Sequence, residues 1–189
     1  MSVKFYNSIE QAITDIINKI DGDIRLGAPL GLGKPNAFIN AMYQRISSMP
    51  ERCLHIFSAL SLTKPTASSD LEARFLEPFV ERVFGDYPDL NYVTDLKNNK
   101  VPNNISVNEF FLKSGDWLNN ANAQQHYINS NYTHIARDMA HNGVNVICQS
   151  IAVRDEADGT RRYSLSCNPD LSEDLLDLLQ PRRDAGERI

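Results

Sequence analysis

The sequence predicts an α/β fold: an open, mostly parallel sheet with helices on both faces and an antiparallel hairpin at its edge. Short apolar runs of strand length alternate along the chain with longer segments whose apolar residues recur at helical spacing. The run 53–60 is apolar at most positions, as expected of a strand covered on both faces. With 189 residues, 42% of them hydrophobic, the chain is long enough for one buried core.

The first quarter of the chain is predicted to form a helix, a short strand and a second helix. Apolar residues within 9–20 share one helical face, and Ser8 with Gln11 has the spacing of a capping box. Residues 24–26 follow as a short strand. A glycine-rich turn then leads into a helix over about 35–47, whose proline suits a first helical turn.

The middle of the chain continues the alternation. Residues 53–60 form the next predicted strand, and Ser69 with Glu72 makes a second capping box. The helix that follows has an apolar face, but Pro78 is expected to kink or split it. Residues 91–94 are a short strand candidate.

A third capping box, Ser106 with Glu109, predicts a helix that ends near Gly115. The segment 118–131 is rich in Asn and Gln and has no clear periodicity. Residues 132–139 carry a helical face that Asn-Gly at 142–143 ends.

The last quarter is predicted to hold a strand, a hairpin and a final helix. Residues 144–153 form the strand with the strongest signal, and 163–167 return antiparallel after a charged turn. Asn-Pro-Asp at 168–170 is expected to cap a helix over 171–179. One domain is therefore predicted over 1–179, and 180–189 as a linker or truncated tail.

Charge and cysteine content narrow the function classes. The net charge is −5, and only the pairs 161–162 and 182–183 bring arginines together, which argues against a nucleic-acid partner. Cys53, Cys148 and Cys167 have no CxxC spacing, and the four histidines show no metal-ligand spacing, so no metal site is predicted. Charged residues near the N-terminus and interrupted apolar runs predict a cytoplasmic protein without a membrane anchor.

The segment 26–36, Leu-Gly-Ala-Pro-Leu-Gly-Leu-Gly-Lys-Pro-Asn, is the most informative motif. Amides of a glycine-rich strand-to-helix turn can bind anionic or carbonyl-bearing ligands. Ala28 and Pro35 break the Walker A pattern, and Asn36 replaces the third glycine of a dinucleotide-binding motif. Two interpretations stay open: a turn that contacts a ligand, or a tight turn that allows backbone packing.

Further motifs accompany this segment in a characteristic order, and together they carry a resemblance. The chain resembles the N-terminal half of the acetyl-CoA hydrolase/transferase family, a branch of the class I CoA-transferases. The motifs are Leu-Ser-Leu-Thr-Lys-Pro (60–65), Glu-Ala-Arg-Phe-Leu-Glu-Pro-Phe (72–79), Ser-Asn-Tyr-Thr-His-Ile-Ala-Arg (130–137), Gly-Val-Asn-Val-Ile (143–147) and Tyr-Ser-Leu-Ser-Cys-Asn-Pro-Asp (163–170).

The resemblance implies a complete protein made of two α/β halves with acyl-CoA bound between them. A glutamate of the second half, beyond residue 189, is expected to attack the thioester and to form an anhydride and then a glutamyl-CoA thioester. A small carboxylate or water completes the exchange. Coenzyme A enters as substrate, the C-terminal half is the expected partner, and a homodimer is one possible assembly. The isolated chain is expected to be inactive.

The resemblance also implies site residues. Gly27, Ala28, Gly31, Leu32 and Gly33 are the candidate amide donors of an oxyanion site, whereas Pro29 has no N–H. Lys34, Asn36 and Lys64 are the candidates for binding CoA, because strand ends of open α/β sheets hold ligands. Acidic residues such as Glu72, Glu77, Glu81 and Glu109 are predicted to cap helices or face solvent.

Two other functions remain alternatives at this point. One is a non-catalytic α/β module that binds an anionic metabolite or a partner domain. The other is a sugar-phosphate isomerase on a similar fold.

Overall fold

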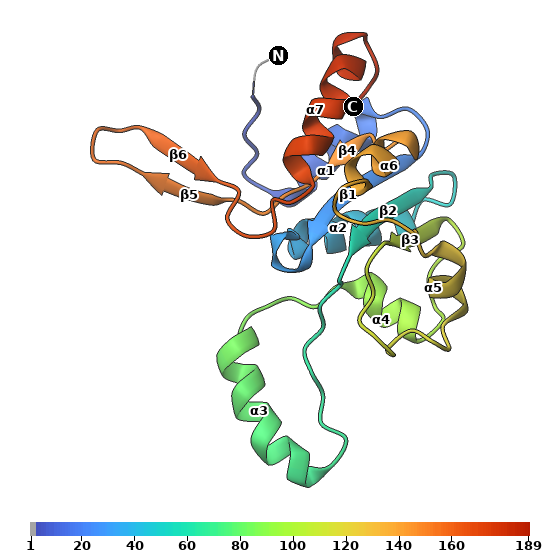
Figure 1. Cartoon of the computed structure of the whole chain (residues 1–189). Coiled ribbons are helices and arrows are strands. Elements are labelled where there is room, and N and C mark those ends of the chain that lie inside the picture. Colours follow the sequence, from blue (N-terminus) through green and yellow to red (C-terminus); the bar gives the residue numbers. More distant parts are fainter. Residues whose placement is uncertain (1–2) are drawn as a thin grey trace.

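A parallel sheet forms the centre of the molecule (Figure 1), as seen in a computed structural model that describes residues 3–189. Its four strands lie in the order β3-β2-β1-β4 and all run parallel. They are β1 (Ile24–Leu30), β2 (Leu54–Ala59), β3 (Ile105–Glu109) and β4 (Val146–Ile147). The α/β prediction is confirmed, and β1 is longer than the predicted strand 24–26.

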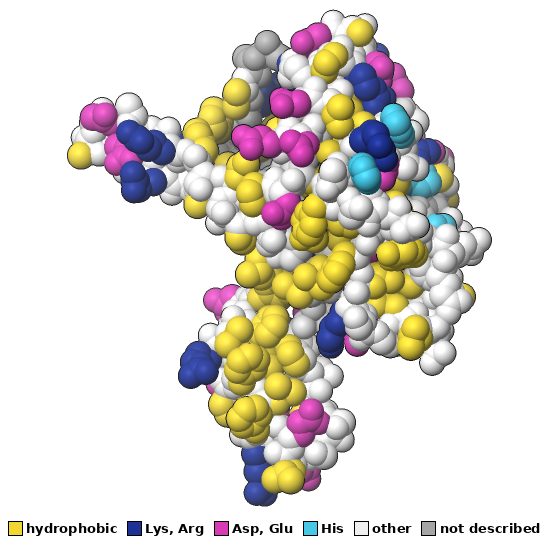
Figure 2. All heavy atoms as spheres, viewed as in Figure 1, with side chains coloured by type: hydrophobic (Ala, Val, Ile, Leu, Met, Phe, Trp, Pro, Cys, Tyr) yellow, Lys and Arg dark blue, Asp and Glu magenta, His cyan; other side chains and the backbone are white. Residues whose placement is uncertain are grey.

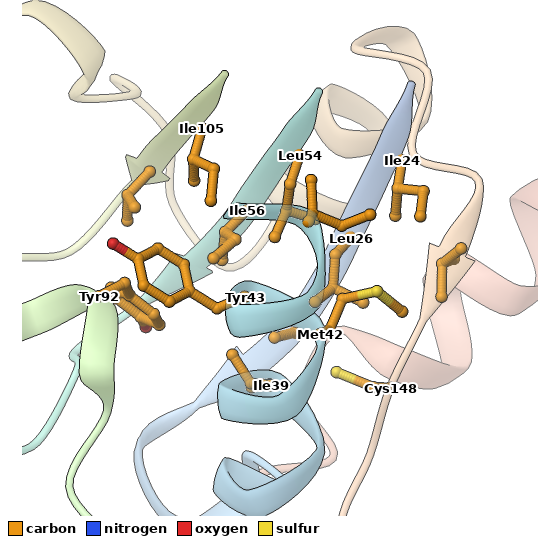
Figure 3. Packing of buried hydrophobic residues seen from close by; sticks show 14 of the residues in the cluster. Ile24, Leu26, Ile39, Met42, Tyr43, Leu54, Ile56, Tyr92, Ile105 and Cys148 are labelled. Atoms are coloured by element: carbon orange, nitrogen blue, oxygen red, sulfur yellow. The ribbon is translucent and has the colours of Figure 1, made fainter. Parts of the chain in front are cut away.

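Helices cover both faces of this sheet, as predicted. On one face α1 (Ile9–Lys19), α2 (Asn36–Ser47) and α4 (Asn91–Lys97) enclose a core cluster, part of which is drawn in Figure 3. On the other face α6 (Ile135–His141) and α7 (Ser172–Asp184) pack on a second cluster. The short α5 (Ala121–His126) lies beside β3. Strands buried on both faces explain the apolar run around β2.

Two predicted helix starts are confirmed in detail. The Ser8 hydroxyl accepts from the Gln11 amide at 3.2 Å at the start of α1. The Ser69 hydroxyl accepts from the Glu72 amide at 3.3 Å at the start of α3 (Asp70–Phe84). Each hydroxyl satisfies a first-turn amide that has no partner within its helix.

Helix α3 projects away from the sheet on two connecting segments (Figure 1). It remains one helix through Pro78, so the predicted split does not occur. All its residues are at least partly exposed, and hydrophobic side chains gather over it in Figure 2. Phe75, for example, is 80% exposed.

The hairpin of β5 (Ala152–Asp155) and β6 (Arg161–Ser164) is confirmed as an antiparallel pair. It forms a sheet of its own and extends from the body in Figure 1. The predicted strand 144–153 is therefore two strands, β4 and β5, because residues 149–151 leave the central sheet after the Cys148 amide donates to the Gly27 carbonyl.

Two predicted elements are wrong in type. Residues 91–94 belong to helix α4, whose Tyr92, Val93 and Leu96 are buried against the sheet. Ser106 and Glu109 lie in strand β3 and not at a helix start, because β3 pairs in register with β2 from Leu54 onward. Long-range pairing overrides the local capping pattern there.

The C-terminal helix also differs from its prediction. Helix α7 begins at Ser172 without a side-chain cap and continues through Pro181 to Asp184, five residues into the segment predicted as a linker or tail. Arg182 Nη1 donates to the Ala140 carbonyl at 3.2 Å, and Ile189 packs against the second core cluster. Over residues 3–189, the structure shows no helix with the length and hydrophobicity needed to cross a bilayer.

Candidate functional site

The site lies where the strand order reverses, between β1 and its neighbour β4. From β1 the chain passes to α2 on one face, and β4 is followed by α7 on the other. Open α/β sheets bind ligands at the carboxyl ends of strands at such a switch point. The glycine turn (Gly31–Gly33), a single 3-10 turn after β1, lies there, and the Ser150 amide donates to its Gly33 carbonyl at 2.8 Å.

The glycine-rich segment is shorter than the sequence suggested. Gly27 and Ala28 lie inside β1, and Gly27 pairs with Phe57 of β2 on one side and Ile147 of β4 on the other. The backbone of Gly27 is therefore committed to the sheet, whereas Ala28 is fully buried at the irregularity where the pairing with β2 skips from Gly27 to Leu30. Among the five candidate donors, only Gly31, Leu32 and Gly33 belong to the turn.

Close packing accounts for two glycines of the turn. A Cβ on Gly33 would lie 2.9 Å from the Cys167 carbonyl oxygen, and Gly31 has a φ of +47° beside the Asn168 side chain. Leu32 between them is 56% exposed. The turn is thus held from inside by residues 167–168, while its central residue faces outward.

The turn runs into the N-terminus of α2. Within the described chain no side chain caps this helix, and its first turn carries no acidic residue. The Asn36 amide donates to the Lys34 carbonyl at 3.0 Å, whereas the amides of Ala37 and Phe38 have no acceptor within the helix. Their partial positive charge favours an anion or a developing oxyanion.

Lys34 follows the turn and is buried. Its ammonium donates to the carbonyl oxygens of Ala59 at 2.5 Å and Leu60 at 3.2 Å. Burial lowers the pKa of Lys34 to about 8, and the nearby Glu109 carboxylate opposes this shift. In this arrangement the side chain supports the end of β2 and does not reach outward toward a phosphate.

A second buried group, Glu109, ends strand β3 on the same edge of the sheet. The Ser61 hydroxyl donates to Glu109 Oε1 and lies 2.6 Å from the Tyr92 hydroxyl. Burial raises the pKa of Glu109 above its ordinary value, although Ser61 and the Lys34 charge both lower it. Hydrogen bonds join Ser61, Tyr92 and Glu109, and the charge of Lys34 acts on Glu109 electrostatically; we call these four residues the strand-end network.

The other two proposed CoA-binding residues lie outside the turn. Asn36 is buried, with its Nδ2 donating to the Pro88 carbonyl at 2.7 Å. Lys64 lies at the base of the α3 arm, where its ammonium donates to the Gly85 carbonyl at 2.9 Å. It borders a cavity of about 670 Å³ between α3 and the segment before it.

Apart from Lys34, the strand-end network was not predicted from the sequence. Glu109 was expected to cap a helix or face solvent, and residue 92 to lie in a short strand. One signal in the sequence could have indicated it. Ile105 and Val107 alternate with polar residues as in a strand, and a strand would place Glu109 on the same buried face as these two side chains. Nothing local in the sequence indicates that Ser61 and Tyr92 meet this carboxylate.

No family model, curated protein or solved structure matches this chain. Across residues 3–189, His, Cys, Asp and Glu side chains form no group of three or more that could hold a metal ion.

Proposed function

We propose that this chain is the N-terminal α/β domain of a cytoplasmic acyl-CoA hydrolase or CoA-transferase, as its sequence resemblance suggests. The proposal depends on one observation above all. The glycine turn ends the strand at the switch point and leads directly into the uncapped N-terminus of α2. This is a place where backbone amides can stabilise the thioester oxygen as it gains negative charge.

Leu32 is the central residue of this proposal. Gly27 is paired in the sheet, Ala28 is fully buried, and Gly31 and Gly33 are packed under residues 167–168. The exposed turn around Leu32 therefore offers the most accessible donors, followed by the first-turn amides of α2. In comparable sites one such donor contributes about 3–4 kcal/mol to transition-state stabilisation.

The buried side chains have supporting roles in this model. Lys34 and Asn36 hold the turn and the start of α2 from inside, so Lys64 is the better candidate for a CoA phosphate. Glu109 is buried and bonded to Ser61, and its raised pKa disfavours the anionic form that a nucleophile needs. The nucleophilic glutamate is therefore assigned to the C-terminal half, with water or a small carboxylate as acceptor.

A non-catalytic assembly module is the second candidate function. The exposed apolar face of α3 favours it, since a lone helix with Phe75 80% exposed gains little from packing in this chain. In that case the turn binds no thioester, and the chain acts by joining a partner.

Amide NMR titration of the chain with acetyl-CoA, CoA and inorganic phosphate distinguishes these functions. We expect acetyl-CoA to produce weak but saturable shifts at Gly31–Lys34 and at Ala37 and Phe38. Leu32→Pro removes one amide and should abolish the shifts of the turn, whereas the matched Leu32→Ala keeps the amide and the shifts. The chain alone should cleave no acetyl-CoA.

The other outcomes contradict the proposal. Equal saturation by acetyl-CoA and by inorganic phosphate indicates a simple anion-binding module. Absence of any shift at millimolar acetyl-CoA in a folded chain removes the acyl-CoA proposal and leaves the assembly module.

A further inference from the structure

Two arginines lie directly opposite each other in the hairpin of β5 and β6, over which basic side chains gather in Figure 2. Arg154 of β5 pairs in register with Arg162 of β6, and their side chains are 73% and 72% exposed. Like charges at directly opposite positions destabilise a strand pair. Every strand residue of this two-stranded sheet is exposed, so the hairpin has little packing to offset the repulsion. An anion that binds both side chains would therefore stabilise it.

A single carboxylate neutralises this arginine pair, Arg154 and Arg162, in part. Glu156 Oε1 accepts from Arg154 Nε at 3.0 Å and from Arg154 Nη2 at 2.5 Å, and it lies 3.0 Å from Arg162 Nε. Over residues 3–189 the structure shows no second acidic partner of either guanidinium. The three charged groups keep a positive net charge, and each guanidinium has about five N–H donors. Donors of both arginines thus remain for a further acceptor.

The arginine pair lines a hollow on one face of the hairpin. Residues 152–154 and 162–164 border about 390 Å³ of space there. Side chains alternate between the two faces of a strand, so Ser164 lies on the same face as Arg162. Arg161 lies on the opposite face, where its Nε is 2.6 Å from Asp155 Oδ1. Two guanidinium groups beside a hydroxyl suit a phosphate, whose oxygens accept bidentate hydrogen bonds from arginine.

Both ends of the hairpin are attached to the glycine turn. The Ser150 amide donates to the Gly33 carbonyl at 2.8 Å, and the Cys167 carbonyl packs against Gly33 from the other end. Arg154 is four residues beyond Ser150, which corresponds to at most about 13 Å of extended chain. The arginine pair is therefore about one strand length away from the turn.

Acyl-CoA has the length and the charge that this arrangement requires. About thirteen bonds of its pantetheine arm separate the sulfur from the diphosphate, which is roughly 15 Å in extended form. A thioester at the glycine turn can therefore place the diphosphate beside the arginine pair. Each phosphate of the diphosphate is ionised and offers acceptor oxygens, whereas Glu156 contacts both arginines through one oxygen.

We propose that Arg154 and Arg162 bind the diphosphate of an acyl-CoA whose thioester lies at the glycine turn. This inference rests on the proposed function and adds to it a binding site on the hairpin. Lys64 is the competing candidate for a phosphate, but its ammonium already donates to the Gly85 carbonyl at the base of the α3 arm.

NMR titration of the chain with two thioesters tests the site. Acetyl-CoA carries the diphosphate, whereas S-acetylpantetheine has the same thioester and arm without it. Both should shift the amides of Gly31–Gly33, but only acetyl-CoA should shift the Nε–H signals of Arg154 and Arg162. Acetyl-CoA should also bind about tenfold more tightly, as expected of charge-assisted hydrogen bonds to phosphate.

Variants of the hairpin make the test specific. Arg154→Gln together with Arg162→Gln should lower the affinity for acetyl-CoA to that for S-acetylpantetheine, whose own affinity should not change. Glu156→Gln should raise the affinity for acetyl-CoA about threefold, because it frees guanidinium donors. Arg161→Gln, on the opposite face, is the matched control and should change the affinity by less than about twofold. The three arginines are exposed, so the chain should still fold.

Three results would overturn the inference and leave the proposed function in place. They are equal affinities for the two thioesters, equal losses with Arg161→Gln and with the double variant, and a loss with Lys64→Met but none with the double variant. Absence of shifts at the turn with either thioester would instead contradict the proposed function, and with it the inference.

Discussion

The Lys34 ammonium, just after the glycine turn, donates to the Ala59 carbonyl at the end of the neighbouring strand β2. It also donates to the Leu60 carbonyl, and Leu60 has a φ of +46°, which is rare for a residue with a side chain. The Leu60 amide donates to the Phe111 carbonyl at 2.8 Å. Lys34 thus links the turn after β1 to a strained residue that connects β2 with the end of β3.

Lys34 should make stability depend on pH in the alkaline range. Its pKa in the folded chain is about 8, against 10.5 for an ordinary lysine. Because the unfolded chain keeps the Lys34 proton between these values and the folded chain loses it, the contribution of Lys34 to the free energy of unfolding should rise as pH increases from 8 to 10.5. Cys148, whose pKa burial raises to about 12, acts in the opposite direction above about pH 9. The rise is roughly 3 kcal/mol at most. Urea unfolding at several pH values between 7.5 and 9.5 measures it.

Two variants separate this effect from other titrations. Lys34→Met should remove the rise between pH 8 and 9.5, while Lys64→Met, which removes a lysine outside the strand-end network, should keep it. If the Lys34→Met and wild-type curves run parallel over this range, Lys34 is not the responsible group.

Ser61 should couple Tyr92 and Glu109, the two buried members of the strand-end network to which it is hydrogen-bonded. Ser61→Ala removes the partner of both the Glu109 carboxylate and the Tyr92 hydroxyl, and we expect a loss of about 1–3 kcal/mol. Tyr92→Phe alone should lower the free energy of unfolding by less, because the Ser61 hydroxyl still donates to the Glu109 carboxylate. The double variant should be less destabilised than the sum of the two by at least about 0.5 kcal/mol. Additive losses in urea unfolding would show that the hydroxyls act independently.

Local signals predicted those parts of the fold that local interactions form. Ser8 and Ser69 each satisfy a first-turn amide, and the strand around Leu54 carries its apolar residues in one short run. The same three-residue spacing between a serine and a Glu or Gln gave a wrong prediction at Ser106 and Glu109, which lie in a strand. The segment is a strand because it pairs with β2, beginning with residue 105 beside residue 54. A local capping pattern contains no information about such a distant strand.

The candidate site was predictable only in part for the same reason. The glycine turn is a continuous motif, so its position after a strand and before a helix was clear from the sequence. The strand-end network joins residues 34, 61, 92 and 109, which come together only through the order of the strands. Burial of Lys34 was also not predictable, because Gly-Lys-Pro is typical of an exposed turn.

Gly33 should not tolerate even a methyl group. A Cβ there would lie 2.9 Å from the Cys167 carbonyl oxygen and 3.0 Å from that of Asn168, so one backbone must move. Gly33→Ala should cost about 1–3 kcal/mol and should increase proteolysis at 165–168. Leu32→Ala, one residue away and exposed, is the matched control and should leave proteolysis unchanged. Equal cleavage of both variants would mean that residues 167–168 do not hold the turn.

Pro78 should weaken α3 without weakening the rest of the fold. A proline inside a helix lacks the N–H that bonds the carbonyl four residues earlier and costs about 3 kcal/mol of helix stability. Because α3 buries no residue in this chain, Pro78→Ala should slow hydrogen exchange of amides 79–84 but shift the melting temperature by less than about 1 °C. The matched control Pro65→Ala lies in the preceding loop and should change neither. A clear rise in melting temperature with Pro78→Ala would show that α3 folds together with the sheet.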